Sequence, residues 1–203
     1  MSGGPGARTG TQSACATWLT LPNLFTLARL LLAPIIVYEI LHRRAFAALS
    51  IFAVAAATDV IDGYLARRFG AATAAGAFLD PIADKLLLTG VYLALALAGS
   101  VPWWLVGVIF GRDLFILASS AVALLATRLR AFPPSIWGKA STFFQILTAV
   151  AFLGRDAFES TLLAALSAAL IWPTLALTVW SGVHYGWRGA RLLRRIDGRA
   201  PGE

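Results

Sequence analysis

Cysteine, histidine and charged side chains are scarce in this chain, and each scarcity excludes a kind of site or protein. Of the 203 residues, one is cysteine, two are histidine and 13% are charged. Cys15 therefore cannot form an internal disulfide, and no cysteine or histidine lies near it to complete a zinc site. Soluble domains carry about 25% charged residues, so the low charge content argues against a soluble protein.

Apolar residues take the place of the missing charges. They make up 59% of the chain, and the mean hydropathy is +0.75, which indicates an integral membrane protein. The net charge is nonetheless +7. Because no basic groove with interleaved aromatic residues is visible, this charge predicts an anionic membrane face or anionic substrates as partners, and no nucleic acid.

Six apolar stretches are long enough to cross a bilayer, which takes about 20 residues. They cover approximately Leu21–Leu41, Ala45–Ala66, Pro81–Ala98, Pro102–Ala126, Ile136–Leu153 and Thr161–Tyr185. The sequence thus predicts an all-α integral membrane protein with six transmembrane helices within residues 18–187. We expect residues 1–17, rich in Gly, Ser and Thr, to be disordered, and residues 188–203 to form a basic tail.

Arginine is unevenly distributed between the predicted loops, and this predicts the orientation of the chain. One side of the membrane would collect Arg8, Arg67, Arg68, Arg128, Arg130, Arg188, Arg191, Arg194, Arg195 and Arg199. The other side would have Arg43, Arg44 and Arg155. Since the more positive loops stay in the cytoplasm, we expect both termini there, and the tail arginines would anchor at the anionic leaflet.

Four aspartates stand in the apolar stretch ATDVIDGYLARRFGAATAAGAFLDPIADKLLL. Residues three and four apart share a helix face, so Asp59 and Asp62 point the same way from one helix, as Asp80 and Asp84 do from the next. Pro81 suits the first turn of a helix that begins near Asp80. The short link between the helices would form a hairpin in which the two acidic faces converge.

Four ionised carboxylates in an apolar setting would repel one another unless cations lie between them. Carboxylates suit magnesium, calcium or manganese, and two such ions about 3.5–4 Å apart serve phosphoryl displacement. The spacing therefore favours a cage for two divalent cations. Two other interpretations stay open: a cation pathway in a transporter, and acids that are neutralised by Arg67, Arg68 and Lys85.

Small residues accompany the acids. Gly63, Ala66 and Gly76 each leave a gap where a ligand or another backbone can approach closely. Arg67 adds a permanent cation suited to a phosphate oxygen. Acids, gaps and a cation together predict a site for a nucleotide diphosphate.

These residues carry a resemblance to a known family. Asp59-x-x-Asp62-Gly63-x-x-Ala66-Arg67, followed after eight residues by Gly76-x-x-x-Asp80-x-x-x-Asp84, is similar to the signature of the CDP-alcohol phosphotransferases at every fixed position. The resemblance implies attack of an alcohol on the lipid-bearing phosphorus of CDP-diacylglycerol, with release of CMP. It also implies a bacterial inner membrane location, a site that faces the cytoplasm, and commonly a homodimer.

The resemblance also assigns roles to individual residues. Asp59, Asp62 and Asp80 would carry most of the ligation of two Mg²⁺ or Mn²⁺ ions, while Asp84 would be the general base and a further metal ligand. Gly63, Ala66 and Gly76 would border the cytidine, with Arg67 on the diphosphate. His42 and His184 are not tied by sequence to the aspartates, so direct displacement is the simpler mechanism. Intramembrane prenyltransferases also pair acidic motifs, but they would not require the Asp-Gly-x-x-Ala-Arg run.

Candidates for the acceptor site lie outside this signature. The segment LPNLFTLARLLLAP resembles the first span of the branch that makes phosphatidylglycerophosphate and cardiolipin, which places Thr26 with the CDP-lipid and Arg29 with the acceptor. Arg29 lies about two turns into its span, which favours a buried partner over snorkelling to the membrane surface. Arg112 and Lys139 are further candidates for an anionic acceptor, although Arg112 could instead pair only with Asp113 or another neighbour.

Two anionic, glycerol-based acceptors remain in competition. Glycerol 3-phosphate is favoured by a small margin, because almost every bacterium needs a phosphatidylglycerophosphate synthase. The Arg112–Asp113 pair and the spacing from Pro134 to Lys139 look more like cardiolipin synthases, which use phosphatidylglycerol.

Overall fold

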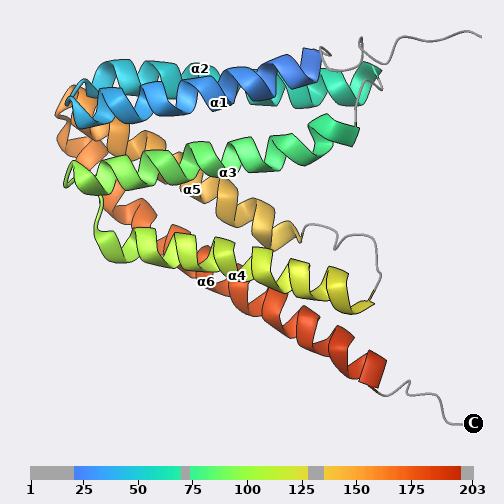
Figure 1. The fold of residues 1–203 in the computed structure, drawn as a ribbon. Coiled ribbons are helices and arrows are strands. Elements are labelled where there is room, and N and C mark those ends of the chain that lie inside the picture. The colour runs from blue at the N-terminus through green and yellow to red at the C-terminus, as the bar shows by residue number, and fades with distance from the viewer. Residues whose placement is uncertain (1–20, 70–73, 128–134, 198–203) are drawn as a thin grey trace, which may run out of the picture.

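The computed structural model describes residues 21–69, 74–127 and 135–197, with side chains at 27–58, 83–119, 135–188 and Arg191. All the regular elements in these ranges are α-helices. They are α1 (Leu21–Leu41), α2 (Ala45–Phe69), α3 (Ala74–Leu97), α4 (Trp103–Thr127), α5 (Ile136–Phe158) and α6 (Thr161–Asp197). The α1–α2, α3–α4 and α5–α6 turns gather at one end of the molecule, and α1 begins and α6 ends at the other (Figure 1). The predicted segment 1–17 lies outside the described residues.

Helix starts follow the breaks in the sequence except at α3. The other helices begin within one residue of the predicted spans, at Leu21, Ala45, Trp103, Ile136 and Thr161. The expectation that Pro81 stands in the first turn was wrong, because α3 begins at Ala74 and Pro81 lies inside it. A proline there removes one backbone hydrogen bond and costs about 3 kcal/mol. The residues before it are mainly good helix formers, and helices of membrane proteins tolerate an internal proline.

In the parts that the structure describes, α2 and α3 do not contact each other, and α1 and α5 pack against both. The α4 helix packs mainly against α6 and only slightly against α3. The described hydrophobic core lies toward the end with the three turns, where it includes Ile36, Phe52, Tyr92, Leu95 and Leu105.

A line of hydroxyl and amide groups joins α5 to α6. The hydroxyls of Thr148 and Thr174 are 2.7 Å apart, and those of Ser141 and Thr178 are 3.2 Å apart. Gln145 Nε2 lies 3.3 Å from both Ser141 Oγ and Thr178 Oγ1. Small polar side chains of this kind let two helices approach closely and satisfy one another where no water is present.

The outer surface is strongly apolar. Large side chains point outward along the bundle, among them Leu117, Leu162 and Trp172, each of which is more than two thirds exposed. Within the described residues, α5 and the part of α6 from Thr161 to Arg188 are long and apolar enough to span a membrane. A surface of this kind is suited to contact with lipid rather than water.

Tyr92 gives a test of the core. It is buried on α3, and its hydroxyl donates to the Gln145 carbonyl on α5 at 2.8 Å. We expect Tyr92→Phe to lower the free energy of unfolding by about 1 kcal/mol and the melting temperature by about 2–4 °C, as measured by thermal unfolding in detergent. The control Tyr38→Phe changes an exposed tyrosine and should have no effect; an equal loss in both variants would contradict the assignment.

Candidate active site

A small cavity lies where four helices meet. Its volume is about 50 Å³, and α1, α2, α3 and α5 contribute to its walls. The lining residues are Arg29, Phe52, Ala55, Ala56, Asp84, Leu87, Leu88, Thr142 and Ile146. The lining includes Ala55 and Ala56 on α2 and Asp84 on α3, so the cavity lies between the two helices that carry the aspartates.

The charged lining of the cavity is an ion pair between Arg29 and Asp84. Arg29 Nη1 donates to Asp84 Oδ1. The arginine side chain is 4% exposed, whereas the side chain of Asp84 keeps 41% of its surface. Arg29 is therefore buried and paired instead of reaching the membrane surface, but its partner, the aspartate expected to act as the base, is only partly buried. Burial of the guanidinium is possible because the carboxylate compensates its charge.

The other three aspartates belong to the same two helices. The side chains of Asp59, Asp62 and Asp80 lie outside the described residues, but their helical positions are defined. Asp59 follows the cavity-lining Ala55 by four residues, and Asp80 precedes Asp84 by four. Positions four apart share a helix face, so the lining of the cavity leads along α2 and α3 toward the acidic positions.

Several other predicted site residues have defined helical positions only. The side chains of Thr26, Ala66 and Arg67, and the surroundings of Gly63 and Gly76, lie outside the described residues. Among the side chains that are described, no three His, Cys, Asp or Glu residues are grouped so that they could hold a metal ion. Asp84 is the one predicted metal ligand in that part of the chain, and its half-exposed carboxylate is a hard oxygen donor of the type that Mg²⁺ and Mn²⁺ prefer.

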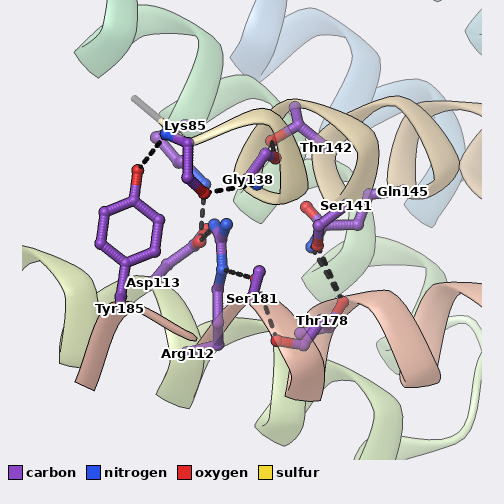
Figure 2. A network of polar contacts seen from close by, with 11 residues as sticks. Lys85, Arg112, Asp113, Gly138, Ser141, Thr142, Gln145, Thr178, Ser181 and Tyr185 are labelled. Carbon is purple, nitrogen blue, oxygen red and sulfur yellow. Dashed lines mark hydrogen bonds and ion pairs between the residues drawn. The ribbon is translucent and has the colours of Figure 1, made fainter. Parts of the chain in front are cut away.

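Beside Asp84, a second ion cluster connects α3, α4 and α6 (Figure 2). Lys85 Nζ and Arg112 Nη1 each donate to Asp113 Oδ1 at 2.6 Å. Arg112 Nε donates to Ser181 Oγ on α6 at 2.8 Å. The expected pairing of Arg112 with Asp113 is thus present. From the sequence, Lys85 was expected only to help neutralise the acids, and its partner on α4, Asp113, could not be predicted.

The first turn of α5 packs against this cluster. Ser135 caps the helix by accepting from Gly138 N at 3.1 Å, and Ser135 N donates to Tyr185 Oη at 2.9 Å. A Cβ at Gly138 would lie 3.3 Å from Arg112 Nη2, so the bare Cα makes room for the guanidinium. Lys139 is exposed in the same turn, and no hydrogen bond or ion pair joins its side chain to the described residues. The structure thus brings Arg112 to the start of α5 but does not bring Lys139 into the ion cluster.

Removal of the shared carboxylate should destabilise the bundle. Asp113→Asn would leave the buried Arg112 and the nearby Lys85 without compensation, and breaking a buried pair costs about 3–5 kcal/mol. We expect Lys85→Met to cost only about 0–1 kcal/mol, because this side chain is 41% exposed. The double variant should recover part of the loss of Asp113→Asn in thermal unfolding. Strict additivity of the two single changes would show that the three charges do not act together.

Comparison with known proteins places this helical bundle in a family. The family model of CDP-alcohol phosphatidyltransferases matches residues 19–180. A "Probable phosphatidylglycerophosphate synthase" of Mycobacterium tuberculosis is 36% identical over 94% of this chain and 90% of its own length. A provisionally named cardiolipin synthase of the same species is 34% identical over 90% of both chains. A "Cardiolipin synthase (CMP-forming)" of Rattus norvegicus is 30% identical over 94% of this chain and 70% of its own length. The chain belongs to the CDP-alcohol phosphatidyltransferase family, and it is a membrane-associated phosphatidyltransferase of phospholipid synthesis.

Proposed function

We propose that the cavity beside Asp84 is the place where a phosphatidyl group passes from CDP-diacylglycerol to a glycerol-based alcohol, with release of CMP. The observation that carries this proposal is the position of Asp84. Its carboxylate faces a cavity between the two helices of the acidic signature, next to the buried cation of Arg29. A proton acceptor, a space and an anion-binding group therefore meet at one point.

The same helices would hold the metal ions that the family generally uses. Asp59 and Asp62 on α2, with Asp80 and Asp84 on α3, offer hard carboxylate oxygens suited to two Mg²⁺ or Mn²⁺ ions. Such ions, when bound, supply charge compensation for the diphosphate and for the departing CMP. The cavity lined by Ala55 on α2 and Asp84 on α3 supports this arrangement, because it lies between the two helices that carry the acids.

The residues of the chain would divide the remaining work. Gly63, Ala66 and Gly76 would admit the cytidine closely, Thr26 would contribute to the CDP-lipid site, and Arg67 would bind the diphosphate. Asp84 would accept the proton of the acceptor hydroxyl as the new oxygen–phosphorus bond forms. The bond from that phosphorus to the CMP oxygen breaks at the same time, so no covalent enzyme intermediate is needed.

Glycerol 3-phosphate is the acceptor that we favour. Arg29 and Arg112 are buried guanidinium groups on two sides of the α3 segment that carries Asp84, and Lys139 is exposed at the start of α5. These cations suit a small dianionic alcohol, and the product would be phosphatidylglycerophosphate. The slightly higher identity to the M. tuberculosis phosphatidylglycerophosphate synthase supports this choice. Phosphatidylglycerol is the second candidate, because relatives from M. tuberculosis and Rattus norvegicus are named as cardiolipin synthases.

The proposed setting is the bacterial inner membrane. All six helices would span it as one catalytic domain over residues 18–187, and both termini, the basic tail 188–203 and the active site would face the cytoplasm. Exposed Trp103 and Trp104 near one end, with Trp137 and Trp187 toward the other, suit two interfacial belts of aromatic residues. A homodimer is the assembly that we expect from the family.

The acceptor can be identified from the products of the purified enzyme. With CDP-diacylglycerol and Mg²⁺, we expect glycerol 3-phosphate to yield CMP and phosphatidylglycerophosphate in stoichiometric amounts, and EDTA to stop the reaction. Mass spectrometry of the extracted lipids distinguishes this product from cardiolipin. Faster CMP release with phosphatidylglycerol would assign the enzyme to cardiolipin synthesis, and no CMP with either acceptor would contradict the proposed reaction.

The role of Asp84 can be separated from substrate binding. We expect Asp84→Asn to lower turnover by about 10²–10⁴-fold, the usual contribution of a general base, while CDP-lipid affinity in calorimetric titration stays close to that of the unchanged enzyme. Asp156→Asn removes a carboxylate at the opposite end of the bundle and serves as the control, with turnover retained. Undiminished turnover in Asp84→Asn would remove its assigned role.

A further inference from the structure

A second, larger cavity lies at the end of the bundle opposite the candidate active site. Its volume is about 360 Å³, within the range of small-molecule sites. Residues of the α1–α2, α3–α4 and α5–α6 turns surround it, and the buried side chains of Ile40, Leu95 and Leu153 form its apolar floor. None of the residues assigned to the transfer reaction lines this cavity.

One wall of the cavity is polar, neutral and fixed. Arg155 Nη2 lies 2.7 Å from Asp156 Oδ1, and Arg155 Nε donates to the same oxygen at 2.9 Å. Ser100 Oγ donates to Asp156 Oδ2, and Arg155 Nη2 donates to the Ser100 carbonyl at 3.3 Å. The charges of Arg155 and Asp156 therefore compensate each other, and both carboxylate oxygens are occupied.

Two further charges in the lining differ from this pair. Arg43 and Glu159 both line the cavity, and neither makes an ion pair or a side-chain hydrogen bond with any residue that the structure describes. They are also too far apart to pair with each other, since no nitrogen–oxygen distance between them is within 4.0 Å. The cavity thus presents one cation and one anion at separate points.

The backbone at these two positions is unusual. Arg43 has φ = 61° and Glu159 has φ = 48°, and within the described residues they are the non-glycine positions with positive φ. Glycine normally ends a helix in this conformation, because a Cβ there strains the backbone. The third turn at this end follows that rule with Gly99 at φ = 79°. The turn geometry therefore does not account for arginine and glutamate at the other two positions, whereas a ligand that binds their charged side chains would.

We propose that this cavity binds the headgroup of a zwitterionic phospholipid that carries a phosphate and a primary ammonium. The phosphate would bind Arg43 and the ammonium would bind Glu159, two exposed charges that line the cavity and are not paired with any described residue. Beside the cavity lie the exposed rings of Phe46 and Phe158, whose centroids are 5.8 Å apart in an edge-to-face contact, and these apolar rings suit contact with the acyl chains of a lipid. This assignment does not depend on the reaction at the other end.

The test compares lipids that differ in the ammonium group. The purified, delipidated protein would be placed in nanodiscs or mixed micelles containing either phosphatidylethanolamine or phosphatidylglycerol, and lipid binding would be measured by native mass spectrometry and thermal unfolding. We expect phosphatidylethanolamine to bind with higher affinity and to raise the melting temperature more. Arg43→Gly and Glu159→Gln should each weaken its binding by about tenfold, the loss expected for one charge-assisted hydrogen bond.

Matched variants separate binding from structure. Arg44→Gln removes a neighbouring, exposed cation that does not line the cavity, and it should leave the lipid preference unchanged. Arg43→Gly should also melt at a higher temperature than the unchanged protein when no lipid is present, because glycine relieves the left-handed backbone. CMP release should be retained in all three variants, so a failure of this proposal is distinct from a failure of the proposed reaction.

Three outcomes would overturn the proposal. The first is equal binding of phosphatidylethanolamine and phosphatidylglycerol by the unchanged protein. The second is unaltered phosphatidylethanolamine affinity in both Arg43→Gly and Glu159→Gln, or the same loss in Arg44→Gln. The third is an equal stabilisation by soluble phosphoethanolamine, which would assign the cavity to a water-soluble zwitterion instead of a lipid.

Discussion

Arg29 and Arg112 are buried among apolar helices, and each is paired there with a carboxylate. An uncompensated charge in such surroundings costs several kcal/mol, so the helices that supply the partners must lie side by side. Asp84 joins α3 to α1 through Arg29, and Asp113 joins α4 to α3 through Lys85. The arrangement of the helices around the candidate active site depends on this pairing, because apolar side chains alone do not distinguish one lipid-soluble helix from another.

The two ion pairs use consecutive residues of α3. Successive residues on a helix point about 100° apart, so Asp84 can turn toward α1 while Lys85 turns toward α4. The second connection is important because the described parts of α3 and α4 otherwise share little packing. Rotation of α3 about its axis would break both pairs at once, and the direction of the Asp84 carboxylate is thereby fixed. The residue expected to take a proton is held in place by its neighbour in the sequence.

The sequence predicted the parts of this structure that depend on local chemistry. Charges, Gly and Pro at the breaks located the starts of five helices. The start of α3 was misplaced, because Pro81 looks locally like a helix start, whereas a helix packed in a bundle tolerates an internal proline. The spacing of the aspartates indicated two acidic faces, and the depth of Arg29 indicated a partner.

Features that depend on tertiary packing could not be predicted. The partner of Arg29 is one of them, because Asp84 lies 55 residues away in the sequence. The same is true of Gly138, whose missing side chain matters only because Arg112 arrives from another helix. The left-handed backbone at Arg43 and Glu159 has no sequence signal, since glycine is absent from both positions.

The hydroxyl groups between α5 and α6 also determine the axial alignment of these helices. Contacts between apolar side chains can be exchanged for similar ones when a helix slides along its neighbour, whereas the Thr148–Thr174 and Ser141–Thr178 bonds exist at one offset only. A slip by one turn, about 5.4 Å, would break these bonds together and carry Tyr185 away from Ser135. These bonds, deep in the bundle, therefore determine how far the first turn of α5 extends toward the candidate active site.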